Sequence, residues 1–183
     1  MTECTKMNLG NALKECCRHK SFSKISISDI TSTCHLNRQT FYYHFEDKYE
    51  LLEWVYYEDG FKDLQKNISF ENWHFHMEKL LETMLEDRIF YENTISSYPV
   101  SFQKGLFEIL CSLFQQAICS LDGRNKLNQQ EIQYYSRFYS YGMCGLIMDW
   151  VNGGMKTSPH VVSMKIRKLA DDSEKMAHER IME

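Results

Sequence analysis

The segment from Ile25 to Leu52 constrains the fold more than any other stretch, because it reads as two short helices joined by a tight break. We expect the first helix to begin after Ser26 and to end near Thr33. Ser26 and Asp29 have the spacing of a capping box, in which each side chain accepts a hydrogen bond from the other residue's backbone N–H. We expect Asn37 to cap the second helix, which runs to Phe45.

This pattern gives the second helix and its surroundings two different sides. The apolar side is expected to point inward and consists of Ile27, Ile30, Leu36, Phe41 and Phe45. The outer side carries hydrogen-bond donors and aromatic rings, namely Arg38, Gln39, Thr40, Tyr42, Tyr43 and His44. A short helix with such an outer side has the shape and chemistry to enter a DNA major groove. By periodicity alone, an ordinary helical hairpin with a solvated outer side fits equally well.

The order of residues favours the DNA-binding interpretation. The runs LNRQTFYYHF (36–45) and DKYELL (47–52) closely resemble the N-terminal helix-turn-helix of the TetR family of bacterial transcription regulators, and the likeness extends over about residues 9–55. That family usually has Ala-Gly at the turn, where this chain has Cys34-His35. The resemblance therefore implies that His35 adopts the left-handed backbone conformation that glycine adopts easily.

The resemblance also implies a domain organisation and a set of DNA contacts. It implies a three-helix DNA-binding head at 1–47, with a first helix at about 5–20, and a helical body at 48–183 for effector binding and dimerisation. We expect Arg38, Gln39 and Thr40 to contact base edges, because Arg suits guanine and Gln suits adenine. The full set expected at the DNA is Ser26, Ser28, Asn37, Arg38, Gln39, Thr40, Tyr42, Tyr43, His44 and Lys48. Those beyond the three base-reading residues would mainly position the phosphate backbone.

Composition agrees with an all-α protein of the cytoplasm. Only two prolines and eight glycines interrupt 183 residues, so long helices are favoured. No apolar run approaches the length of a membrane span, and the N-terminus has no signal-peptide pattern. Residues 1–50 carry seven basic and six acidic side chains, whereas the remainder carries 14 and 19. A slightly positive head on an acidic body predicts modest non-specific affinity for DNA.

The C-terminal part carries a second resemblance. The stretch YGMCGLIMDWVNGGMKTSP resembles the dimer-forming region of a TetR subgroup that includes the dihydroxyacetone-kinase operon regulators, over about residues 135–170. It implies that the last two helices pair with their symmetry mates as a four-helix bundle. Gly142 and Gly145 each cost a helix roughly 1 kcal/mol relative to Ala, which close approach of another helix would offset. The surrounding aromatic and Met residues are interpreted mainly as core, not as a ligand-binding box.

Together these features predict a homodimeric regulator that binds a palindromic operator on double-stranded DNA. Its effector is left open between a small molecule and a coactivator protein. Two alternatives remain: a helical protein-interaction adaptor, and a metal-responsive regulator built on some of the seven His and seven Cys. The cysteines are expected to be reduced and mostly buried. The sequence contains no recognisable catalytic, cofactor-binding or metal-binding motif, so we expect no cofactor and no enzymatic activity.

Overall fold

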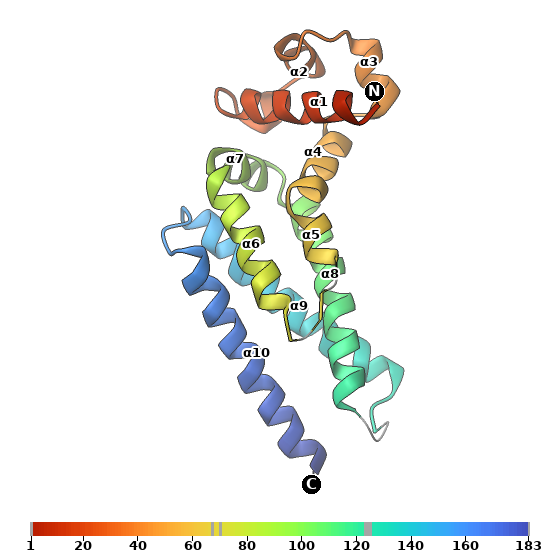
Figure 1. Ribbon diagram of the computed structural model, residues 1–183, viewed down its shortest axis with the longest axis vertical. Helices are drawn as coiled ribbons and strands as arrows, with labels where there is room; N and C mark the ends of the chain where they lie inside the picture. Colours follow the sequence, from red (N-terminus) through yellow and green to blue (C-terminus); the bar gives the residue numbers. More distant parts are fainter. Residues whose placement is uncertain (1, 67, 70, 123–125, 183) are drawn as a thin grey trace.

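The computed structural model is all-helical over the residues that it describes, 2–66, 68–69, 71–122 and 126–182. A small head stands at one end of an elongated body, and the C-terminus lies at the far end (Figure 1). The head contains α1 (Thr2–Cys17), a 3-10 turn η1 (Phe22–Lys24), α2 (Ile27–Thr33) and α3 (Arg38–His44). The body contains α4 (Lys48–Tyr56), a π-helical turn η2 (Tyr57–Phe61), α5 (Lys62–Gln65), α6 (Trp73–Glu86), α7 (Arg88–Ser97), α8 (Pro99–Leu121), α9 (Gln129–Asn152) and α10 (Pro159–Met182). The predicted all-α fold with its helix-turn-helix head is confirmed.

The core of the head follows the predicted apolar pattern. Ile30, Phe41 and Phe45 are buried, and Ile27 and Leu36 are partly buried against the same cluster. The first helix starts and ends about three residues earlier than expected, and it packs against α2, α4 and α7. The head therefore rests on the body through α1 and not through α4 alone.

In the body, neighbouring helices along the chain do not always pack together. α8 and α9 lie along one another, whereas α10 turns away and packs along α6 (Figure 1). Asn128 and Glu131 form a capping box at the start of α9. α10 begins at Pro159, the favoured first position for proline. Because α10 leaves α9, each of these two helices keeps an outward face within one chain.

The sequence from Asp47 to Lys66 has the apolar spacing of a single helix that joins the head to the body, but in the structure this helix is not continuous. It begins as predicted, with Asp47 accepting hydrogen bonds from the backbone N–H groups of Tyr49 and Glu50. The π turn η2 then interrupts it. Gly60 sits in this turn, where an added Cβ would lie 2.3 Å from Leu80 Cδ1. A larger residue would push the Leu80 side chain aside, because α6 packs directly on the turn.

Two polar attachments hold the head on the body. Asn93 of α7 donates hydrogen bonds to the carbonyls of Cys17 and Lys20 and accepts one from the Phe22 N–H. Lys14 of α1 lies 2.7 Å from one carboxylate oxygen each of Asp59 on η2 and Asp87 before α7. Burial alone would lower the pKa of the Lys14 ammonium, but the hydrogen bonds and charges of the two carboxylates raise it. The position of Lys14 on the polar side of the first helix predicts exposure to solvent, and this prediction is wrong because the side chain is half-buried and paired.

Candidate nucleic-acid interface

The geometry of the candidate interface starts from three local features that fix α2 and α3. Ser26 Oγ accepts from the Asp29 N–H and the Asp29 carboxylate accepts from the Ser26 N–H, so the predicted capping box is present. Asn37 caps α3 by accepting from the Thr40 N–H at 2.7 Å. Between the helices, His35 has φ 55°, the left-handed conformation expected at this position. These features set the angle at which α3 leaves the turn.

The outer side of α3 is uncovered by the rest of the chain. Tyr42 and Tyr43 are 50% and 78% exposed, and Arg38 and Gln39 are also exposed. Thr40 is half-buried and its hydroxyl donates to the Asn37 side chain. α3 lies at the end of the molecule away from α8 and α10, so the body does not obstruct it (Figure 1).

The side chains on this surface are partly preorganised by one another. Arg38 donates from Nη2 to the Tyr42 hydroxyl at 3.3 Å, and its guanidinium stands 6.0 Å from the centre of the Tyr42 ring. The Tyr43 and His44 rings meet edge to face at 4.9 Å. Such contacts limit the rotamers of these side chains, which reduces the entropy lost when they order against a ligand. Ser26 and Ser28 are exposed at the start of α2, and Ser26 also serves the cap.

Lys48 has a different position from the one expected of a phosphate contact. Its Nζ donates to the carbonyls of Phe22, Ser23 and Ile25, at 2.8, 3.1 and 2.8 Å. These are all three donors of the ammonium group. Burial lowers the pKa of Lys48, although the neighbouring Cys17 and Asp47 act in the opposite direction. Lys48 therefore ties α4 to the loop around η1, and its role at DNA stays a prediction.

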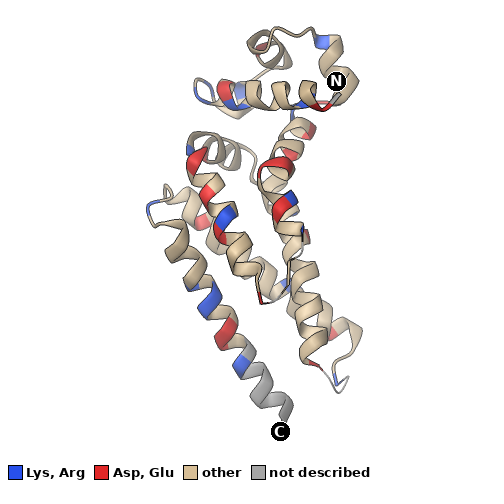
Figure 2. Ribbon diagram, viewed as in Figure 1, with Lys and Arg blue, Asp and Glu red and all other residues tan. Residues whose placement is uncertain are grey.

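The distribution of charge follows the division expected from sequence. Acidic side chains lie along α4 and α6 in the body (Figure 2). Lys20 of the head, whose charge could otherwise serve a phosphate contact, forms an ion pair with Asp29. This pair and the Ser26 hydrogen bonds lower the pKa of Asp29, which keeps the cap ionised. Lys20 thus stabilises the start of α2.

Comparison with known proteins identifies the family. Residues 11–55 match the model for bacterial regulatory proteins of the tetR family, and residues 71–172 match the model for a transcriptional regulator C-terminal region of the same family. The second match covers more than half of the chain. This chain belongs to the TetR family. The family and the relatives that it matches are transcription regulators, not enzymes.

The individual TetR-family relatives have low sequence identity to this chain. The chain is 32% identical over 88 residues to the HTH-type dhaKLM operon transcriptional activator DhaS of Lactococcus lactis subsp. lactis (strain IL1403), covering 48% of this chain and 47% of that protein. It is 23% identical to the uncharacterized HTH-type transcriptional regulator YxbF of Bacillus subtilis (strain 168), covering 92% of this chain and 45% of that protein. The matched region thus spans about half the length of these curated relatives.

Solved structures support the TetR fold. A dihydroxyacetone kinase operon activator DhaS superposes with a TM-score of 0.71 at 24% identity, covering 94% of this chain and 97% of that one. FadR of Thermus thermophilus, a TetR-family repressor crystallised with lauroyl-CoA, superposes with a TM-score of 0.54 at 16% identity, covering 90% and 92%. These comparisons confirm that the chain is similar to the TetR family and to its dihydroxyacetone-kinase operon regulators, as the sequence indicated.

Other sequence-based expectations for this TetR-family chain have mixed outcomes. All seven cysteines are free, as expected, but only Cys16, Cys17 and Cys144 are buried. Within the described residues, no three His, Cys, Asp or Glu side chains gather as a metal site would require. His74 is buried and its Nε2 accepts from Arg167 Nη1 at 3.0 Å. In the same part of the chain, no helix is both long and apolar enough to cross a lipid bilayer.

Sequence reasoning missed Lys14, Asp59 and Asn93, which set the orientation of the head. Lys14 lies 45 residues before Asp59, and Asn93 lies 76 residues after Cys17. A lysine on the polar side of an amphipathic helix carries no local sign that it will be paired. The only local sign in the sequence that this region is irregular was Gly60, because glycine is unfavourable inside a helix.

Proposed function

We propose that this protein is a cytoplasmic transcription regulator that binds a palindromic DNA operator as a homodimer and is controlled through its body. The observation that carries the proposal is the uncovered outer face of α3, where Arg38, Gln39 and Tyr42 project together. Arg38 and Gln39 have the geometry for two-point hydrogen bonds to guanine and adenine in the major groove. Tyr43, His44, Ser26 and Ser28 flank them and suit contacts to phosphate and sugar. Lys48 is left outside this set because its donors have partners within the head.

The dimer part of the proposal is supported by an apolar stripe on α9. Its exposed aromatic and aliphatic members are Tyr134, Tyr135, Phe138, Tyr141 and Leu146. These aromatic residues are exposed within a single chain, so the expectation that they mainly form its core is wrong. Met143 and Trp150 on the same helix are buried. A Cβ added at Gly142 or Gly145 would meet nothing within 4 Å, so packing within the chain gives no reason for these glycines. A helix of a second copy that approaches closely would supply one.

A two-fold dimer also provides the specificity that a single head lacks. α3 has only seven residues and reaches a few base pairs. Two such helices about 34–36 Å apart would read two half-sites in successive major grooves, which is why operators of this geometry are palindromes.

Selection of bound sequences from a random pool of double-stranded DNA tests the proposal, with the full chain as bait. We expect enrichment of a palindrome with half-sites about one helical turn or a multiple apart. Arg38→Ala should weaken binding to the selected DNA by roughly 1–3 kcal/mol and relax one position in each half-site. Arg18→Ala is the matched control, because Arg18 is exposed just after α1 and pairs with Glu15. Absence of any enriched sequence, or equal effects of both substitutions, would favour the adaptor alternative.

A further inference from the structure

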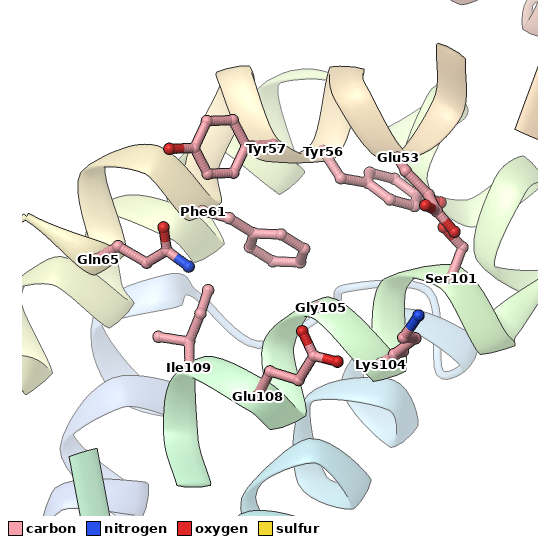
Figure 3. A pocket seen from close by; sticks show the side chains of 10 residues that line it. All are labelled: Glu53, Tyr56, Tyr57, Phe61, Gln65, Ser101, Lys104, Gly105, Glu108 and Ile109. Atoms are coloured by element: carbon pink, nitrogen blue, oxygen red, sulfur yellow. The ribbon is translucent and has the colours of Figure 1, made fainter. Parts of the chain in front are cut away.

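The body contains a groove between the helix that leaves the head and α8. It encloses about 180 Å³ and opens to solvent beside η2 (Figure 3). Side chains from α4, η2, α5 and α8 line it: Glu53, Tyr56, Tyr57, Phe61, Gln65, Ser101, Lys104, Gly105, Glu108 and Ile109. This volume is below the roughly 300–1,000 Å³ of pockets for drug-sized ligands. The groove therefore suits a compact molecule.

A buried hydroxyl in this groove has no partner. Ser101 is 5% exposed, and its Oγ makes no hydrogen bond within the described part of the protein. Other buried hydroxyls on helices here donate to the carbonyl four residues earlier, as Ser136, Ser140 and Thr94 do. Ser101 is the third residue of α8, so the residue four positions before it precedes the helix. An unpaired buried hydroxyl is unfavourable, and a ligand atom in the groove would satisfy it.

The charges around the groove favour a cation. Glu53 and Glu108 contribute two carboxylates and Lys104 one ammonium, and none of these three forms an ion pair among the described residues. Figure 3 shows the Glu108 side chain directed from α8 toward the groove, opposite the rings of Tyr57 and Phe61. Carboxylates combined with aromatic faces attract organic ammonium ions by charge and by cation–π interaction.

The same stretch of chain connects the groove to the head. Tyr57 and Phe61 of η2 line the groove, and Asp59 between them pairs with Lys14 of α1. The turn is tightly held, since a Cβ on Gly105 would lie 2.6 Å from the Phe61 ring and one on Gly60 would lie 2.3 Å from Leu80. Phe61 is packed against Gly105 of α8, so a ligand that displaces its ring would press on the turn. π-helical turns are rare and recur at functional sites.

We propose that this groove binds a small organic ammonium compound with a hydrogen-bonding group for Ser101 Oγ, which can donate or accept, and that η2 relays its occupancy to the head through Asp59 and Lys14. The regulatory meaning of this relay rests on the proposed DNA-binding function. Binding and relay are both measurable without DNA, so they can fail independently of that function.

Isothermal titration calorimetry on the full-length protein tests the ligand class. The probes are 1,4-diaminobutane and ethanolamine, with butane-1,4-diol as the neutral match and butyrate as the anion. We expect the amines to bind and the diol and butyrate not to bind. The double variant Glu53→Gln/Glu108→Gln should lose about tenfold in amine affinity, whereas Lys104→Gln should gain about two- to fivefold because a competing cation is removed. Binding of the diol as tightly as the amines, no amine binding, or weaker binding by Lys104→Gln would overturn the assignment.

Hydrogen–deuterium exchange with and without 1,4-diaminobutane tests the relay. Amide exchange in α1 and α2 should change on amine binding in the wild type and remain unchanged in Asp59→Asn. This variant keeps the shape of the side chain and removes its charge, while Asp87 still pairs with Lys14. Gly105→Ala, which presses on Phe61, should change the same amides without amine. Asp63→Asn is the matched control, because Asp63 lies on the exposed side of α5 and pairs with Lys79. An amine response in Asp59→Asn equal to that of the wild type would overturn the relay.

Discussion

Two non-glycine residues in the described part of the chain hold a left-handed backbone, His35 at φ 55° and Met155 at φ 47°. The conformation costs an L-residue roughly 1–2 kcal/mol. His35 is exposed, so only the geometry of the helix-turn-helix break requires the residue to adopt it. Met155 is 3% exposed, and its side chain is part of the core. The same backbone angle therefore has different consequences at these positions.

His35→Gly should raise the free energy of unfolding by roughly 0.5–1 kcal/mol. The relief of left-handed strain exceeds the extra backbone entropy that glycine gives the unfolded chain, about 0.4–1 kcal/mol. Met155→Gly is the matched control at the same backbone angle, and it should lower stability by about 2 kcal/mol or more because a buried side chain is lost. Urea denaturation of both variants measures the difference. A loss of stability in His35→Gly would show that its side chain has an unrecognised contact.

At the scale of elements, the features predicted correctly from sequence are those encoded by neighbouring residues. The caps at Ser26 and Asn37 follow from spacings of three residues, and the left-handed turn at His35 follows from the resemblance to the TetR family. The π turn and the Lys14 attachment depend on Leu80, Asp59 and Asp87, which are distant along the chain. No local pattern contains that information. For the same reason the sequence does not reveal the hydrogen bonds of Lys48 to the carbonyls of Phe22, Ser23 and Ile25.

Lys48→Ala should lower the free energy of unfolding by roughly 1–3 kcal/mol, because three backbone carbonyls lose a charged donor. Lys24→Ala serves as control, since Lys24 is exposed on η1 and its replacement should change stability by less than about 0.5 kcal/mol. Chemical denaturation gives both values. If Lys48→Ala kept wild-type stability and only reduced the salt dependence of DNA binding, the phosphate contact expected from the sequence would be right.

The packing of α10 on α6 should depend on pH through His74. Burial lowers its pKa, and the adjacent Arg167 guanidinium acts in the same direction, against weaker opposing effects of Asp171 and Glu78. The unfolded chain, with a histidine pKa of about 6.5, therefore binds more protons than the folded chain below that pH. By linkage, the free energy of unfolding falls as pH drops through about 6.5.

His74→Gln should weaken this dependence, because the amide oxygen still accepts from Arg167 and does not titrate in this range. Melting temperatures measured between pH 5 and 8 would show a shallower decline for the variant than for the wild type. His19→Gln, at an exposed position on the head beside Glu15, should retain the wild-type decline. Parallel curves for His74→Gln and the wild type would assign the pH dependence to other groups.

At the scale of the whole molecule, the arrangement of α9 and α10 has a consequence for assembly. α9 is covered by α8 on one side, and its opposite side exposes the stripe from Tyr134 to Leu146. From the sequence this stripe was interpreted mainly as core, because hydrophobic periodicity identifies a buried side without saying which molecule buries it. An exposed stripe of large aromatic residues on one chain is typical of a protein–protein interface.

Phe138→Glu should convert the proposed dimer into monomers at micromolar concentration. Phe138 is 71% exposed in one chain, so a carboxylate there does not disturb the fold, whereas at a paired interface it would be buried opposite its symmetry mate. Phe75→Glu on α6 is the matched control, because Phe75 is 66% exposed on a helix outside the stripe and should leave the dimer intact. Sedimentation velocity measures both.

Because one head reads too few base pairs, the Phe138→Glu monomer should also lose binding to the selected palindrome while retaining its helical circular dichroism. A dimer that survives Phe138→Glu would place the interface elsewhere, and the outward faces of α10 would be the next to test.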